Sequence, residues 1–175
     1  MASDPKAQSK LGRILRHRWL DEADTRKAIP PDLLQRLAQR VAASEQRHTG
    51  QIRIYVEAGL PMSYLWRDAT ARERAMAIFG KLRVWDTEHN NGVLVYLLLA
   101  ERAIEIVADR GLDRHVAPEE WKAIVARMSG AFREGRFEDG LTQALEEVSA
   151  LLVQHFPVAD GEAHRNELPD EPVLG

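Results

Sequence analysis

The chain has 175 residues, a formal net charge of −3 and no cysteine, which suits one domain that buries roughly two thirds of its unfolded surface. The weakly acidic charge argues against general nucleic-acid binding, which needs a dense basic field, and the lack of cysteine excludes disulfides, thiolate zinc sites and cysteine nucleophiles. Its first ten residues hold no apolar segment typical of a secretory signal, and no apolar run approaches the ~20 residues of a bilayer span, so we expect a cytoplasmic protein without a transmembrane segment.

The first part of the chain predicts a short tail followed by a basic amphipathic helix. Residues 1–9 are expected to be disordered, and residues 10–29 to form the helix and a linker. Apolar side chains recur there at helical spacing, opposite lysine and arginine: Leu11, Ile14, Leu15 and Trp19. Such a helix usually packs its apolar residues on its own domain. The alternative is that it binds an anionic membrane surface or a partner protein.

Residues 30–156 are predicted to form a single domain of alternating helices and strands. The run from Val93 to Leu99, seven apolar residues bounded by turn residues, is typical of a strand buried on both faces. Residues 51–57 alternate polar and apolar side chains, which is typical of a strand at or near an edge. In chain order we expect a helix from Pro31 to before Thr49, strand 51–57, a helix over 65–82, strands 93–99 and 103–109, a helix from Pro118 to Gly135, and a helix over 141–152.

The order of these elements predicts the topology. A strand, a crossover helix and a second strand form a βαβ unit, so strands 51–57 and 93–99 should be parallel. Strand 103–109 follows so closely that it must pair with 93–99 as an antiparallel hairpin. The fold class is therefore α/β: an α/β/α sandwich with a small mixed sheet, strand 93–99 being central. Residues 157–175, with three prolines and five acids, are expected to be a disordered acidic tail.

Acidic and amide side chains cluster where the hairpin brings its two outer ends together. They precede its first strand or follow its second: Asp86, Glu88, Asn90, Asn91, Asp109 and Asp113. Such oxygens are the ligands that Ca²⁺ and other hard cations prefer, so we predict a divalent-cation site, with Asp86, Asn91, Asp109 and Asp113 converging on one pocket. The alternative is turn chemistry alone, because asparagine and glycine tolerate positive φ and the acids would be solvated. His89 and His115 could reach the same place, but without paired metal-ligand spacing we interpret them as surface histidines.

Several segments together resemble the TPM domain family (thylakoid lumen protein, Psb32 and MOLO-1). They are a helix ending near Thr49-Gly50-Gln51, an Ile-x-Ile-x-Val strand, Asn91-Gly92-Val93-Leu94 before a hydrophobic hairpin, and Phe132 to Leu141 before a last helix. The similarity covers roughly residues 30–155. It implies an α/β/α sandwich and links to divalent-cation binding, phosphatase activity and accessory roles at membrane complexes. Relatives carry Gly-x-Gly-x-Glu after the hairpin, whereas this chain has Asp109-Arg110-Gly111-Leu112-Asp113.

No enzyme motif defines a reaction. The sequence has no dinucleotide-binding loop, phosphate-binding P-loop or serine elbow. Phosphatase chemistry without cysteine would need a metal-activated water at the acidic residues. We therefore expect a non-catalytic TPM-like binding module with a divalent cation as its leading small ligand. The alternatives are a metal-dependent phosphatase using the same residues, and a module that binds an unidentified protein or a membrane surface through the N-terminal helix. Three tryptophans are expected in or beside the core: Trp66, Trp85 and Trp121.

Overall fold

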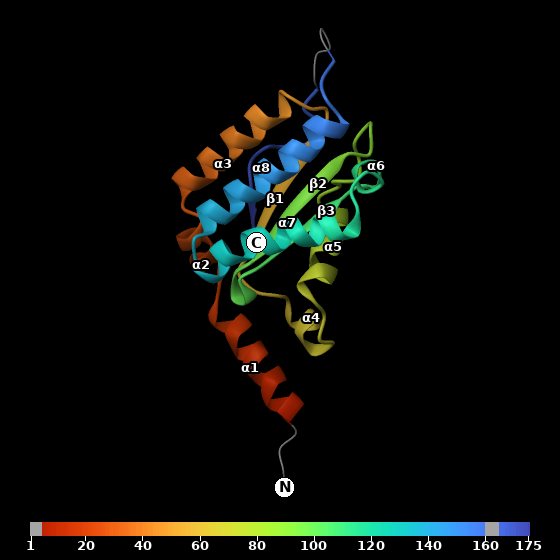
Figure 1. The fold of residues 1–175 in the computed structure, drawn as a ribbon. Coiled ribbons are helices and arrows are strands. Elements are labelled where there is room, and N and C mark those ends of the chain that lie inside the picture. The colour runs from red at the N-terminus through yellow and green to blue at the C-terminus, as the bar shows by residue number, and fades with distance from the viewer. Residues whose placement is uncertain (1–4, 160–164) are drawn as a thin grey trace.

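A four-stranded mixed sheet forms the middle layer of the computed structural model, which describes residues 5–159 and 165–175 (Figure 1). The strands lie in the order β3-β2-β1-β4, with bounds β1 Gln51–Glu57, β2 Gly92–Leu98, β3 Ala103–Ala108 and β4 Val173–Leu174. β1 and β2 are parallel, and β3 is antiparallel to β2. The predicted βαβ unit and hairpin are therefore confirmed, as is the α/β class.

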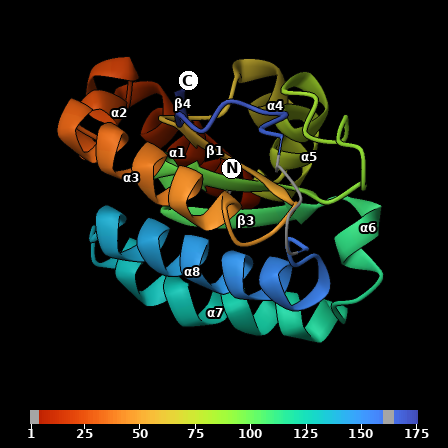
Figure 2. The same ribbon diagram turned by 90° about the horizontal axis from the view of Figure 1, so that it is seen from above.

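Helices cover both faces of this sheet (Figure 2). One face carries α2 (Glu22–Ala28), α3 (Pro31–Glu45), α7 (Pro118–Arg133) and α8 (Phe137–His155), and the other carries α4 (Met62–Trp66) and α5 (Ala71–Lys81). Three more elements complete the described chain: α1 (Pro5–Trp19), the 3₁₀ turn η1 (Leu99–Glu101) after β2, and α6 (Arg110–Asp113) after β3.

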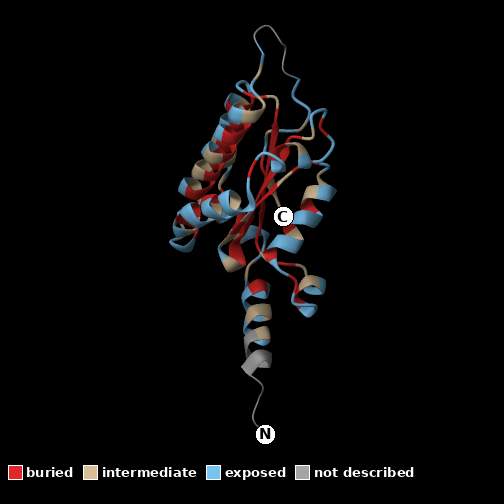
Figure 3. Cartoon of the chain, turned by 45° about the vertical axis from the view of Figure 1, so that its right-hand side comes forward, coloured by how far each residue is buried: buried red, intermediate tan, exposed pale blue. Residues whose placement is uncertain are grey.

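Strand β2 supplies both halves of the core. Its odd-numbered residues pack with α3, α7 and α8, and its even-numbered residues pack with α4 and α5. From Val93 to Leu98 every side chain has 0% exposure, and the buried residues in Figure 3 concentrate on the strands and the inner faces of the helices. This confirms the prediction of a central strand with two apolar faces.

The helix predicted over 65–82 is interrupted. α4 ends at Trp66 and α5 begins at Ala71, and Asp68 between them has a left-handed φ of 54°. Thr70 then starts α5 with a capping box: its Oγ1 accepts from Glu73 N–H at 3.2 Å, and the Glu73 carboxylate accepts from Thr70 N–H at 2.7 Å. Because Thr-x-x-Glu favours a new helix start, the break has a local cause.

Helix α1 is attached by polar side chains and by Ile14, which packs against the core beside α4 and α5, so the expectation that its apolar residues pack inward holds for Ile14 alone. Arg13 donates to the Glu101 carboxylate at 2.8 Å and to the Ala69 carbonyl at 2.7 Å. His17 Nδ1 accepts from Leu60 N–H at 2.9 Å, so the proton lies on Nε2, which donates to Glu101 at 3.0 Å. The hydrogen bond from His17, aided by Arg13, lowers the pKa of Glu101 to about 2.

The other three apolar residues of the predicted helix face lie outward. The exposed fractions are 59% for Leu11, 50% for Leu15 and 84% for Trp19. The helix begins at Pro5, so the predicted disordered tail is wrong for residues 5–9, and residues 1–4 lie outside the described chain. Trp66 and Trp85 are also exposed, which corrects their predicted place in the core, whereas Trp121 packs against it.

The C-terminal segment returns to the sheet. β4 pairs in parallel with β1, with Val173 opposite Tyr55. The prediction of a disordered tail over 157–175 is therefore wrong for residues 165–175, while residues 160–164 lie outside the described chain. β1 consequently lies between β2 and the two-residue outer strand β4, which agrees with its predicted position at or near an edge.

Two polar side chains of β1 hold this segment. Gln51 Oε1 accepts from the N–H groups of Glu167 and Leu168 at 2.9 and 2.8 Å. Arg53 donates to the carbonyls of Pro169 and Glu171. Both side chains bind backbone groups of the segment. The amino-acid composition of residues 165–175 therefore does not predict these contacts.

Candidate functional site

The loop before β2 and the turn after β3 meet at one end of the sheet. Asp109 N–H donates to the Gly92 carbonyl at 2.8 Å, and Gly111 N–H donates to the Asn90 carbonyl at 2.8 Å. A Cβ on Gly111 would collide with the same Asn90 carbonyl oxygen, so this approach of two backbones requires glycine. Backbone contacts therefore hold the two polar segments together, as the hairpin predicted.

Asn91 and Asp109 are the two candidate ligands that the fold buries here. Asn91 Nδ2 donates to Thr49 Oγ1 at 3.1 Å, and its N–H donates to Thr87 Oγ1 at 3.1 Å. Asp109 caps α6, since its Oδ1 accepts from Arg110 N–H at 2.7 Å. The other oxygen of each side chain, Asn91 Oδ1 and Asp109 Oδ2, is buried and has no hydrogen-bond partner among the described residues. Two unsatisfied acceptors thus lie at the ends of adjacent strands.

The other four candidate ligands make different contacts. Asp86 pairs with Arg83 at 2.6 Å. The Oδ1 of Asn90, a residue with a left-handed φ of 52°, accepts from Arg110 at 3.1 Å, so turn chemistry accounts for Asn90. Glu88 is exposed at the sheet end. Asp113 is also exposed and lines a separate cavity beside β3.

The histidines that the structure describes form no metal cluster with these acids. His115 stacks on His155 with ring centroids 5.0 Å apart, and His89 is exposed. Over residues 5–159 and 165–175, no three histidine or acidic side chains are grouped so that they could hold a metal ion. A cation here would need the Asn91 amide and water besides the Asp109 carboxylate.

A buried acid that was not among the predicted ligands lies at the same end of the sheet. Glu45 is 3% exposed, and its Oε1 accepts from Ile52 N–H at 2.8 Å. Burial raises the pKa of Glu45 to about 8, and the nearby Asp170 carboxylate adds to this shift. A signal was present, because Glu45 continues the spacing of four that places Leu37 and Val41 on the buried face of α3.

Comparison with known proteins identifies the fold and the family. The solution structure of BA42, a protein from the psychrophilic bacterium Bizionia argentinensis, matches with a TM-score of 0.69 and 24% sequence identity, covering 81% of this chain and 91% of BA42. A search of curated proteins finds no match. No helix in the described part of the chain has the length and apolar character of a membrane span. The sequence profile of the TPM domain matches residues 23–151, well over half of the chain, and this protein therefore belongs to the TPM domain family.

Proposed function

We propose that this TPM-domain protein is a non-catalytic binding module that takes up a divalent cation beside Asn91 and Asp109. One observation carries the proposal: Asn91 Oδ1, just before β2, and Asp109 Oδ2, just after β3, are buried without a hydrogen-bond donor among the described residues. A buried carboxylate oxygen without a partner is costly. A hard cation removes that cost by coordinating oxygen directly.

The donor set favours a cation that keeps part of its water shell. One carboxylate and one amide oxygen are far fewer than the 6–8 ligands that Ca²⁺ takes, so water or the exposed Glu88 would supply the rest. Mg²⁺ ordinarily retains several waters. With so little fixed charge, we expect dissociation constants on the order of 10⁻⁴–10⁻³ M, as in weak calcium modules.

Thermal unfolding with added metal tests this proposal. A ligand specific for the folded state adds RT ln(1 + [L]/Kd) to the free energy of unfolding, so CaCl₂, MgCl₂ or MnCl₂ should raise the melting temperature in a concentration-dependent way. Asp109→Asn should abolish the rise. Asp86→Asn is the matched control and should retain it, because Asp86 already pairs with Arg83 at an exposed position.

Two results would overturn the proposal. If none of the three metals shifts the wild-type melting temperature at millimolar concentration, a buried water is the better partner for the two oxygens. Metal-dependent turnover of a generic phosphomonoester, lost in Asp109→Asn, would replace the non-catalytic role by the phosphatase alternative.

The outward apolar face of α1 favours a second candidate function, binding to an anionic membrane surface. Leu11, Leu15 and Trp19 are exposed, and Arg16 and Arg18 on the same helix are exposed as well. Arginines flanking a tryptophan- and leucine-bearing face are typical of interfacial helices. The inner side of α1 is held by Arg13 and His17, so this face can remain presented while the helix stays attached.

Vesicle flotation tests the second candidate. Wild-type protein should float with vesicles of phosphatidylcholine and phosphatidylglycerol and much less with phosphatidylcholine alone. The double variant Leu15→Ser/Trp19→Ser should lose binding. Met76→Ser is a matched control, because Met76 is also exposed, at 58%, but lies on α5. Equal flotation of the double variant and the control would contradict a role for α1.

A further inference from the structure

Strand β3 presents a free edge. It is the outermost strand on the side of the sheet away from β4. Asp109 N–H donates to the carbonyl of Gly92 opposite it, and in an antiparallel pair every second residue bonds to the neighbouring strand. The backbone groups of the intervening residues therefore point outward: Ile104, Ile106 and Ala108. The Ile106 carbonyl accepts from Arg72, which confirms this direction.

In the part of the chain that the structure describes, most of these outward groups are unpaired. Within the described chain, the N–H groups of all three residues and the carbonyls of Ile104 and Ala108 have no hydrogen-bond partner. Ile104 and Ile106 are each 4% exposed as whole residues, and Ile106 and Ala108 line the cavity beside the strand. Unpaired backbone groups at a sheet edge are a template for another strand. Arg72 donates to the Ile106 carbonyl in the middle of this edge, so an added strand would compete with it there. Its side chain is half exposed and its ion pair with Glu105 is long, at 3.6 Å, so we expect the competition to cost little.

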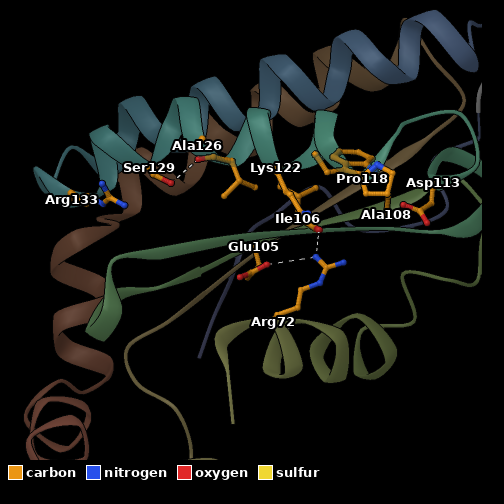
Figure 4. Close-up of a pocket in the computed structure, with 12 residues that line it drawn as sticks. Arg72, Glu105, Ile106, Ala108, Asp113, Pro118, Lys122, Ala126, Ser129 and Arg133 are labelled. Carbon is orange, nitrogen blue, oxygen red and sulfur yellow. Dashed lines mark hydrogen bonds and ion pairs between the residues drawn. The ribbon is translucent and has the colours of Figure 1, made fainter. Parts of the chain in front are cut away.

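A groove runs along this edge between α5 and α7 (Figure 4). Its volume is about 780 Å³. On the α7 side, Trp121, Val125 and Ala126 give a mainly apolar lining that Lys122 and Ser129 interrupt, whereas the α5 side is formed by Arg72 with Glu105 on the strand. A strand added to β3 would place alternate side chains toward these two sides, so the groove favours apolar residues facing α7 and polar residues facing α5.

The two ends of the groove carry opposite charge. Figure 4 shows Asp113 beside Ala108 at one end and Arg133 beyond Ser129 at the other. Neither Asp113 nor Arg133 makes an ion pair with any residue that the structure describes. β3 runs from the Arg133 end toward the Asp113 end, because Ala108 is its last residue. A peptide running antiparallel to β3 would bring its amino end to Asp113 and its carboxyl end to Arg133.

We propose that this groove binds an extended peptide, which pairs with Ile104, Ile106 and Ala108 as an antiparallel fifth strand. The peptide alternates apolar and polar residues, begins with a basic group and ends with an acidic one. Backbone hydrogen bonds hold such a ligand, and alternate side chains and terminal charges give it specificity. This site is independent of the cation proposed at Asn91 and Asp109.

A designed heptapeptide, Lys-Val-Thr-Val-Thr-Val-Glu, is the probe. Titration followed by amide NMR should shift the signals of Ile104, Ile106 and Ala108. Two analogues carry N-methyl groups on alternate backbone amides, each analogue on the set that the other leaves unmodified. Only one of the two sets has N–H groups that face β3. The analogue methylated on that set should bind at least about tenfold more weakly than the parent, and the other analogue within about threefold of it. This comparison leaves the protein unaltered.

Charge reversal tests the orientation. Arg133→Glu should weaken binding of the parent peptide and improve binding of the peptide with lysine and glutamate exchanged. Lys81→Glu is the matched control, because Lys81 and Arg133 both lie in the last turn of a helix, and it should change neither affinity.

Four results would overturn the proposal. The first three are no binding at millimolar peptide, equal losses for both N-methylated analogues, and amide shifts that miss β3. The fourth is a concentration-dependent dimer whose contacts map to β3, because a second copy of the chain would then be the natural occupant of the edge.

Discussion

At the end of the sheet where β1 finishes, Glu57 is buried with its partners, whereas at the opposite end Asp109 is buried with one oxygen unpaired. Arg74 Nε contacts both Glu57 oxygens, at 3.0 and 3.2 Å, and Arg74 Nη2 lies 2.5 Å from Oε1. Tyr96 Oη donates to the same carboxylate at 2.7 Å. Asp109 receives one N–H at Oδ1, and Oδ2 has no donor among the described residues.

The contrast separates a structural charge from a candidate ligand. The fold surrounds Glu57 with an arginine and a phenol, so both of its oxygens are satisfied without any other molecule. Burial and the Glu57 charge raise the pKa of Tyr96, which keeps the phenol protonated as a donor. Asp109 has no comparable supply of donors, and a bound cation or water would provide what the protein does not.

Removing the satisfied carboxylate should have the largest effect. Glu57→Ala would leave Arg74 as a largely buried cation without its partner and Tyr96 without its acceptor. Breaking such a pair from one side costs about 3–5 kcal/mol, which urea unfolding would measure. The double variant Glu57→Leu/Arg74→Met is the control and should recover a large part of the loss, because it removes both charges. A loss below about 1 kcal/mol for Glu57→Ala would show that solvent reaches this end of the sheet.

Glu45 tests a third way of burying a carboxylate, namely protonation. Its ordinary pKa of 4.5 is raised to about 8 in the folded protein, so the folded state holds an extra proton between these values. The stabilisation is full below about pH 4.5 and is lost as the pH rises through 8. Wild-type protein should lose about 2–3 kcal/mol between pH 5.5 and 7.5 relative to Glu45→Gln, at roughly 1.4 kcal/mol per pH unit. Parallel pH curves for the two proteins would contradict this assignment.

The behaviour of Glu45 shows where sequence analysis succeeds and where it stops. The apolar run at 93–99 and its short connection to 103–109 predicted the central strand and the hairpin, because buried strands and tight connections are local features. The same hairpin explains why the backbone of Asp109 pairs with Gly92, the residue after Asn91, whereas the convergence of the predicted ligands on one pocket stays a prediction. Glu45 was not predicted to be buried, because its burial depends partly on the C-terminal segment. Gln51 and Arg53 bind backbone groups of that segment, which its amino-acid composition does not reveal.

The separation of the candidate ligands has a similar explanation. Asp86 lies in the predicted loop, but Arg83 three residues earlier neutralises it. Asp113 follows Asp109 by one helical turn, because α6 forms where a loop was expected. That turn places Asp113 on the groove beside β3. The pattern of hydrophobic residues in a sequence predicts neither which side chains pair nor a helix of only four residues.

Asp109→Asn should have the smallest effect on stability and the clearest effect on binding. The amide oxygen can still cap Arg110 N–H, and the change removes a buried charge that the protein does not pair. The free energy of unfolding in EDTA should therefore be unchanged or up to about 1 kcal/mol higher. A loss of more than about 1 kcal/mol in EDTA would mean that protein groups satisfy this carboxylate after all, as they do for Glu57, and Asp109 would then be a structural residue. An unchanged stability in EDTA, together with the loss of any metal-dependent rise in melting temperature, would instead assign the unpaired oxygen to a bound cation.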